Sequence, residues 1–150
     1  MSNIITIDGP SGTGKGTICS YLAHLLEWNF LDSGALYRVL AHAADNSAIN
    51  YKNEIELVKL AEGLHVEFKL VDPKSVAEVF LEGINVTKEI RTESCGKSAS
   101  LIAPIPTIRK ALLVLQRKFL KEPGLVADGR DMGTVVFPDA KLKIFLTASI

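Results

Sequence analysis

Short apolar segments alternate with longer amphipathic segments along most of this chain. Residues 3–8, 125–128 and 143–146 are rich in apolar or β-branched residues without polar alternation, which is typical of strands buried in a parallel sheet. A brief extended piece is predicted at residues 30–31. Apolar positions at helical spacing predict helices over residues 15–26, 34–44, 54–63, 93–102 and 107–120, with Ser33 as the cap of the second and breaks at Pro104 and Pro106 before the last.

The pattern changes between residues 64 and 86. Apolar and polar positions alternate over residues 65–70, Asp72 and Pro73 mark a turn, and a second apolar piece covers residues 79–81. Such alternation predicts a small antiparallel sheet with one face in solvent. The order of elements therefore indicates an α/β fold in which an antiparallel insertion separates the first strands from the last two.

Composition places this pattern in an ordinary globular chain. Its 150 residues are 47% apolar and 23% charged, and 17 basic groups balance 17 acidic ones. Because polymeric phosphates and anionic membranes attract proteins with a basic excess, zero net charge argues against a general nucleic-acid or membrane-surface binder. A small anionic ligand held by a few well-placed cations stays open.

The cysteines and the two chain ends indicate the cellular compartment of the protein and whether the sequence is complete. Cys19 and Cys95 lie far apart and neither forms a metal-ligand pair with a nearby histidine. No segment reaches the roughly 18 apolar residues of a membrane-spanning helix, and the N-terminus lacks a signal-peptide pattern, so a reduced, cytoplasmic protein is expected. The chain stops after the strand at 143–146, without the covering helix of a parallel sheet, and we expect it to be part of a longer protein.

A glycine-rich segment follows the first predicted strand and opens the first predicted helix. Its glycines let backbone N–H groups point inward around an anion, and the helix N-terminus adds partial positive charge. Lys15 can reach the outer phosphates of a nucleotide; Gly16 stands where the strict pattern has a hydroxyl, so Thr17 is the candidate Mg²⁺ ligand. The alternative is a turn with an incidental lysine. The segment predicts a nucleotide-phosphate site, for which the resemblance described below implies ATP, made of Gly9, Pro10, Ser11, Gly12, Thr13, Gly14, Lys15, Gly16 and Thr17.

A second charged segment follows the strand at residues 125–128. Ligands of open α/β sheets gather beyond the carboxyl ends of the strands, so Asp128, Arg130 and Asp131 are expected to face the same crevice as the glycine-rich loop. Asp128 is placed to act near Mg²⁺, directly or through a water, and Arg130 to clamp a phosphate. The alternative is a solvated turn with a surface ion pair.

Two further arginines are weaker candidates for the same anion site. Arg38 lies five residues after Ser33 and is expected to fold toward the same strand ends. Arg109 lies on a predicted helix whose other face is apolar. Taken alone, each is typical of a solvated charge on a helix.

Together these motifs resemble the bacterial cytidylate (CMP) kinase family. The resemblance runs through the whole chain in order, over the blocks at residues 9–17, 31–38, 89–92, 127–134 and 135–140. The blocks LDSGALYR at 31–38 and ADGRDMGT at 127–134 are far more specific than the glycine-rich loop alone.

That resemblance implies an enzyme that transfers the γ-phosphoryl group of ATP, with Mg²⁺, to CMP or dCMP. It implies a P-loop NTPase-like parallel sheet flanked by helices, with residues 1–37 and 97–150 as an incomplete core and residues 38–96 as the insertion that binds the nucleoside monophosphate. The partners implied are ATP and CMP or dCMP, with no nucleic-acid polymer and no membrane, and the expected state is a monomer.

The resemblance also implies roles for single residues. The expected catalytic residues are Lys15, Arg38, Asp128 and Arg130, and the expected metal ligands are Thr17 and Asp128. The expected contacts of CMP are Ser11, Asp32, Ser33, Arg38, Ser100, Arg109, Arg130 and Asp131.

Three residues of that set, Ser100, Arg109 and Asp131, fall where the family recognises cytosine. Cytosine carries an amino donor beside acceptors at N3 and O2, which suits acceptors on Asp131 and Ser100 and a donor on Arg109. Uracil reverses donor and acceptor at two of these positions and would leave buried groups mismatched.

Alternatives stay open at this point. Family members continue beyond Ile150 through an arginine-bearing lid and an adenine-binding loop, so a fragment that binds CMP without useful turnover is one alternative. Another small-molecule P-loop kinase, for shikimate or adenylate, is a second, against which the block at 127–134 and the antiparallel insertion speak. For Ser100 alone, the alternative is a buried helix hydroxyl bonded to its own backbone.

Overall fold

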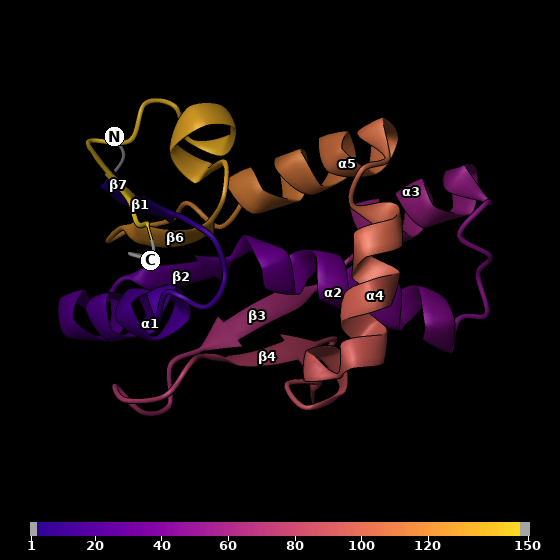
Figure 1. Ribbon diagram of the computed structural model, residues 1–150, viewed down its shortest axis with the longest axis horizontal. Coiled ribbons are helices and arrows are strands. Elements are labelled where there is room, and N and C mark those ends of the chain that lie inside the picture. Colours follow the sequence, from indigo (N-terminus) through magenta and orange to yellow (C-terminus); the bar gives the residue numbers. More distant parts are fainter. Residues whose placement is uncertain (1–2, 148–150) are drawn as a thin grey trace. The chain divides into compact units, whose positions relative to one another are not determined.

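The computed structural model describes residues 3–147. The predictions about the two ends of the chain rest partly on residues 1–2 and 148–150, which lie outside the described residues. Its elements are β1 (Ile4–Asp8), α1 (Lys15–Leu26), β2 (Asn29–Asp32), α2 (Ser33–Asn46), α3 (Glu54–Glu62), β3 (Val66–Lys69), β4 (Glu78–Leu81), β5 (Ile84–Asn85), the 3₁₀ turn η1 (Glu89–Arg91), α4 (Glu93–Ile102), α5 (Pro106–Arg117), β6 (Leu125–Gly129), the π-helical turn η2 (Met132–Val136) and β7 (Leu142–Phe145) (Figure 1). The described chain divides into two compact units. The first holds the described residues up to Ser33, Phe68–Ala77 and those from Gln116 onward; the second holds Gly34–Glu67 and Glu78–Leu115.

A four-stranded parallel sheet forms the centre of the first unit. The strand order is β2-β6-β1-β7, and every pair in it runs parallel. Ile4 of β1 lies opposite Leu125 of β6, and Asp8 lies opposite Phe145 of β7. A second, three-stranded sheet has the order β3-β4-β5, with β4 and β5 antiparallel. The predicted fold class, a parallel sheet with helices and a small antiparallel sheet, is confirmed.

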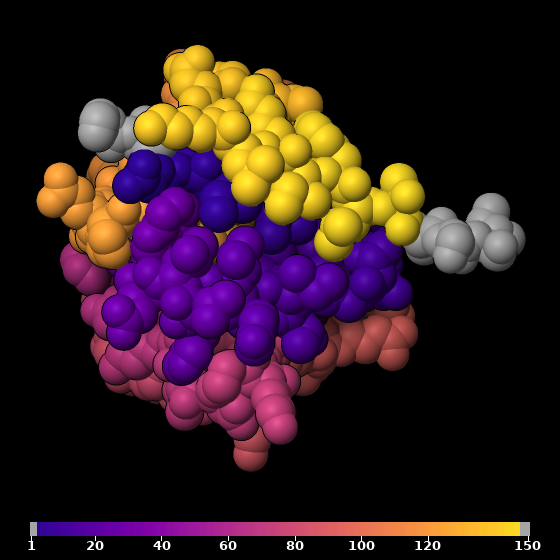
Figure 2. All heavy atoms as spheres, turned by 90° about the vertical axis from the view of Figure 1, so that its left-hand side faces the viewer, coloured from indigo at the N-terminus to yellow at the C-terminus, as the bar shows by residue number. Residues whose placement is uncertain are grey.

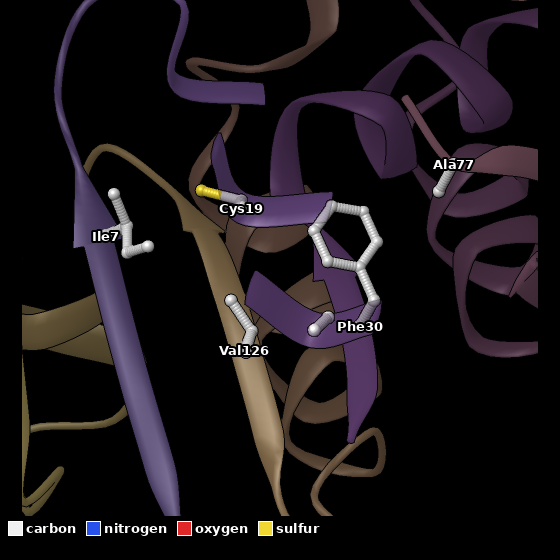
Figure 3. Packing of buried hydrophobic residues seen from close by; sticks show 6 residues of the cluster. Ile7, Cys19, Phe30, Ala77 and Val126 are labelled. Carbon is white, nitrogen blue, oxygen red and sulfur yellow. The ribbon is translucent and has the colours of Figure 1, made fainter. Parts of the chain in front are cut away.

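The core of the first unit lies between α1 and the sheet (Figure 3). The side chains that α1 buries are small, which lets the helix approach the strands closely: Cys19, Ser20 and Ala23. Phe68 packs edge-on against Phe30 with ring centroids 5.8 Å apart, and so brings the segment 68–77 onto this core. The buried cluster consists of Ile7, Cys19, Ala23, Phe30, Ala77 and Val126.

The last strand is more exposed than its sequence predicts. β7 lies at the edge of the sheet, and its Leu142 and Phe145 are 49% and 59% exposed. The prediction of a buried strand at 143–146 is wrong because an edge strand has a neighbour on one side alone among the described strands. In Figure 2 the C-terminal segment lies directly beside the N-terminal residues, as the pairing of β7 with β1 requires.

The helices of the second unit follow the predicted periodicity, with small shifts at their ends. The side chains they bury almost completely recur at helical spacing: Leu36, Val39, Leu40, Leu57, Ile102, Ile108 and Leu112. Helix α4 has the predicted bounds, and the Thr92 hydroxyl caps it by accepting from the Cys95 amide at 3.1 Å. Helix α2 begins at Ser33 itself, and α5 begins at Pro106, which suits a first turn because its missing N–H has no helical partner there.

In the described part of the chain, no single helix is long and apolar enough to cross a bilayer. Helices α4 and α5 reach that length and apolar content as a pair, with a bend of 107° between them.

Candidate active site

The glycine-rich loop joins β1 to the N-terminus of α1. Gly12 and Gly14 have φ angles of 84° and 79°, in the left-handed region that favours glycine. Gly14 has no side chain with which to cap α1, so an anion can take the place of a cap at the N–H groups of the first turn. The Thr13 hydroxyl donates to the Pro10 carbonyl at 3.0 Å and closes the loop on itself, while Ser11 and Thr17 are exposed. The backbone therefore has the form of an anion cradle.

Lys15 and Asp128 meet where α1 begins and β6 ends. The Lys15 ammonium donates to Oδ1 of Asp128, and the two side chains are 13% and 4% exposed. Burial, together with the charges of Asp32 and Asp8, raises the pKa of Asp128 to about 6 against the opposing effect of Lys15. Asp32 is the register neighbour of Asp128 in the adjacent strand, which explains the strength of its effect. The structure thus brings together one predicted loop residue and one residue of the second charged segment.

The donors around this pair fit a Mg²⁺ ion in their chemistry. Asp128 and Thr17 offer a carboxylate and a hydroxyl, and oxygen ligands are those that Mg²⁺ prefers. Burial and the charges of Asp32 and Asp8 raise the pKa of Asp128 despite its bond to Lys15, so a second cation beside the carboxylate would stabilise its charged form. Within residues 3–147 no group of three or more His, Cys, Asp or Glu side chains could hold a metal. A Mg²⁺ ion here would therefore take further ligands from nucleotide phosphates and water.

Asp8 is a buried carboxylate that sequence reasoning did not single out. It is 2% exposed, and its two oxygens accept one backbone N–H each, from Met132 and Gly133, both at 2.8 Å. Met132 is the first residue of η2, so Asp8 holds the beginning of this turn. The sequence signal that could have identified Asp8 is its position as a charged residue at the end of an otherwise largely apolar strand.

Arg117 holds the other end of the same turn and was also missed. Its Nε donates to the Val136 carbonyl at 3.0 Å and its Nη2 to the Val135 carbonyl at 3.2 Å. A lone arginine near the end of an amphipathic helix carries no sequence signal for such a role.

Arg130 and Asp131 occupy the two positions between β6 and η2. Arg130 is exposed and Asp131 half-buried. The Asp131 carbonyl accepts from the Val135 and Val136 amides at 2.9 and 3.1 Å, which ties this residue to the turn. Both residues therefore stand beside a hydrogen-bonded turn, while their predicted roles toward phosphate and cytosine stay predictions.

Arg38, in the second unit, is held by backbone carbonyls. Its Nη1 donates to Ile90 at 2.7 Å and to Thr92 at 3.3 Å, so the guanidinium lies at the beginning of α4. The Cys95 thiol donates to the Arg38 carbonyl at 3.3 Å. These contacts orient the side chain, while its predicted role toward the strand ends stays a prediction.

Ser100 and Arg109 are both exposed side chains of the second unit. The Ser100 hydroxyl donates to the Gly96 carbonyl at 3.0 Å, four residues earlier in α4. The Ser100 hydroxyl is therefore bonded to its own helix backbone, as the alternative expected, but the side chain is exposed and not buried. Its oxygen lone pairs can still accept a hydrogen bond. Nη1 of Arg109 donates to the Ala103 carbonyl at 3.5 Å, a long bond. Ser33 is buried at the start of α2, directly after Asp32 ends β2.

Two glycines of the loop are expected to respond oppositely to alanine. A Cβ at Gly9 would stand 2.6 Å from the Leu146 carbonyl oxygen, whereas a Cβ at Gly16 would meet its nearest atom, Cγ1 of Val76, at 3.7 Å. Leu146 donates to the Asp8 carbonyl at 2.7 Å, so this backbone can move only by weakening the β1–β7 pairing. We expect Gly9→Ala to lower the free energy of unfolding by about 1–3 kcal/mol. Gly16→Ala, in the first turn of α1, should be neutral or slightly stabilising.

Urea unfolding of the two alanine variants beside the parent chain measures this difference. Equal midpoints for Gly9→Ala and Gly16→Ala would show that the strand end is not packed against the loop.

The sequence of this chain is similar to those of known proteins. The family model described as cytidylate kinase matches residues 5–150. A cytidylate kinase of Pseudomonas putida is 56% identical over 149 residues, which cover 99% of this chain and 65% of that protein. The cytidylate kinases of Pseudomonas fluorescens and Stutzerimonas stutzeri are each 58% identical, over 99% and 97% of this chain and 65% and 64% of their own lengths. The chain thus spans just under two thirds of the length of the curated relatives that it matches.

Proposed function

Because this chain belongs to the cytidylate kinase family, we propose that it carries the ATP and CMP sites of an enzyme that transfers the γ-phosphoryl group of ATP to CMP or dCMP, giving CDP or dCDP. The observation that carries the proposal is the glycine-rich loop between a parallel strand and a helix, with Lys15 bonded to Asp128 where both meet. Loop N–H groups and a lysine at this place are the means by which P-loop enzymes hold the β- and γ-phosphates.

The donor nucleotide would be held chiefly by the backbone of residues 9–17. Lys15 would stabilise the negative charge of the phosphoryl group during its transfer. Phosphoryl transfer requires little covalent chemistry from the protein, so its catalysis depends on positioning and electrostatics. Asp128 and Thr17 would hold Mg²⁺, which when bound neutralises phosphate charge. The pairing of Lys15 with Asp128 keeps the ammonium at the loop before any nucleotide arrives.

The acceptor phosphate would be held by Arg38 and Arg130, with Ser11 nearby. A guanidinium offers two parallel N–H donors to a phosphate, and the carbonyls of Ile90 and Thr92 already fix the plane of Arg38. Since the acceptor phosphate is an anion near neutral pH, no strong general base is required. Asp32 and Ser33, where β2 meets α2, would complete the contacts to the acceptor nucleotide.

Cytosine would be recognised by Asp131, Ser100 and Arg109. The oxygens of Asp131 and Ser100 would accept from the amino group, and Arg109 would donate to the ring acceptors. The proposal draws support from the Ser100 hydroxyl, whose proton goes to Gly96, so that its oxygen is presented as an acceptor. We further propose a monomer in the cytoplasm, where a reducing environment would suit the two free, buried cysteines.

Calorimetric titration of this chain with CMP, UMP and AMP tests the proposal, followed by an ATP-coupled turnover assay on the same sample. CMP is expected to bind about tenfold or more tightly than UMP, because uracil reverses the donor and acceptor groups that Asp131, Ser100 and Arg109 would meet. The three side chains are exposed or half-buried before the nucleotide binds, so the mismatch would cost most where the bound base itself covers them. Asp131→Asn, which replaces an acceptor oxygen by a donor, should reduce this preference, whereas the exposed Asp139→Asn should not. Equal affinities for CMP and UMP in the parent chain would contradict the assignment of the base site.

The turnover assay separates a competent kinase from a binding fragment. CMP-selective binding with severely reduced turnover would support the fragment alternative for the 150 residues. Turnover within about tenfold of a full-length relative would exclude it.

A further inference from the structure

We propose that Asp8 and Arg117 are positioning residues, which hold the two ends of η2 and thereby fix Arg130 and Asp131 for the acceptor nucleotide. The inference rests on the proposed function, because it assigns a purpose to the segment expected to bind CMP. Neither side chain has to touch the nucleotide.

The turn itself needs outside support. In a π-helical turn each amide bonds to a carbonyl five residues earlier, as Val136 does to Asp131 at 3.1 Å and Phe137 to Met132 at 2.7 Å. Such turns are rare and occur frequently at functional sites. A five-residue turn satisfies few of its own end groups, so its first N–H and last C=O groups must find other partners.

Asp8 supplies the partners at the beginning of the turn. A carboxylate that accepts two N–H bonds at 2.8 Å makes two charge-assisted contacts in a place that is 2% exposed. The Asp8 backbone is itself fixed by strand pairing on both sides, opposite Gly129 of β6 and Phe145 of β7. The central strand of the sheet thus determines where the turn begins.

Arg117 supplies the partners at the end of the turn. Its guanidinium donates to the carbonyls of Val135 and Val136 through two different nitrogens, a fork that lysine cannot reproduce. With both ends held, the residues between β6 and η2 lose most of their freedom to move. With the backbone at Arg130 and Asp131 held, binding of the acceptor nucleotide would require less ordering of this segment.

The test compares two variants with matched controls. Arg117→Met and Asp8→Asn each remove one support, while the exposed Lys118→Met and Asp139→Asn remove equivalent charges nearby. Calorimetry should show CMP affinity about tenfold weaker in Arg117→Met, with ATP affinity changed by less than about threefold, since a hydrogen bond to a charged group is worth about a factor of ten or more. Arg117→Lys, which keeps one donor, should recover part of the loss, and the two controls should match the parent chain.

Amide hydrogen exchange provides a readout that does not depend on any nucleotide. Exchange at Met132 and Gly133 should be faster in Asp8→Asn than in the parent chain, because asparagine offers one acceptor oxygen where aspartate offers two. If Asp8→Asn does not fold, the CMP affinities of Arg117→Met and Arg117→Lys test the proposal, because Arg117 is exposed and its replacement is less disruptive.

The two possible failures are distinct. A parent chain that binds no CMP overturns the proposed function, and this inference with it. A parent chain that binds CMP, together with an Arg117→Met variant that binds it equally well, overturns the positioning role alone. Equal losses of ATP and CMP affinity in Arg117→Met would also overturn it, since they would indicate a general structural effect.

Discussion

Lys15→Met is expected to lower the proposed ATP-dependent turnover of CMP by about 10²–10³-fold, the usual effect of removing one preorganised charge that stabilises a transferring group. This lysine is the one cation within the glycine-rich segment 9–17, and its ammonium is already held in place by Asp128. ATP affinity, measured by calorimetry, should fall as well. The exposed Lys118→Met, which removes a cation away from the loop, is the matched control and should retain parental turnover.

The same change is expected to destabilise the fold, because it leaves the Asp128 carboxylate buried without its partner. Breaking a buried ion pair from one side costs about 3–5 kcal/mol, whereas replacing both partners is often close to neutral. The double variant Lys15→Met/Asp128→Asn should therefore regain most of the free energy of unfolding at pH 7 but none of the turnover. A Lys15→Met variant as stable as the parent in urea would mean that the pair contributes nothing to the folded state.

Asp128 should also make stability depend on pH between about 4 and 6. Its pKa is 3.8 in the unfolded chain and about 6 in the folded one, so in this window the folded state holds a proton that the unfolded state has lost. The free energy of unfolding contributed by this group is therefore fully present below pH 3.8 and is lost as the pH rises through 6. The whole change amounts to about 3 kcal/mol.

Urea unfolding of the parent chain and Asp128→Asn at pH 4, 5, 6 and 7 measures this contribution. Asparagine does not titrate, and the other groups contribute to both proteins alike, so the stability of the parent relative to the variant should fall by about 2 kcal/mol from pH 4 to pH 7. The exposed Asp139→Asn should show a constant difference across the same range. A constant difference for Asp128→Asn would contradict the raised pKa of this carboxyl.

Elements with strong local signals were predictable from the sequence. The predicted bounds of α1 and α4 agree with the structure to the residue, because glycine precedes the first and a hydroxyl caps the second. The parallel sheet was predictable from short apolar segments, because such segments indicate buried strands even when the strand order is unknown. Such features are indicated by local residue patterns, without knowledge of the distant residues that they contact.

Features that depend on distant partners were not predictable. The exposure of β7 follows from its place at the sheet edge, which no local pattern states. The turn η2 is held by Asp8, 124 residues away, and by Arg117, on a helix that looks like an ordinary amphipathic one. For the candidate site, the sequence predicted Lys15 and Asp128 through the topology of α/β sheets, and the structure brings the two together. The roles of Arg38, Ser100 and Arg109 came from the family resemblance and stay predictions.

The strand order of the first unit also sets a sequence of events during synthesis. Among the described strands β1 is made before its neighbours in the sheet, β6 and β7, and Leu125 is added about 120 residues after its partner Ile4. At 5–20 residues per second that delay is roughly 6–25 seconds. All residues of the second unit are made within the delay, so that unit can fold while the apolar first strand still waits for its neighbours. During that time β1 and β2, which both pair with β6, are strands that a chaperone, or a second nascent chain, would encounter unpaired.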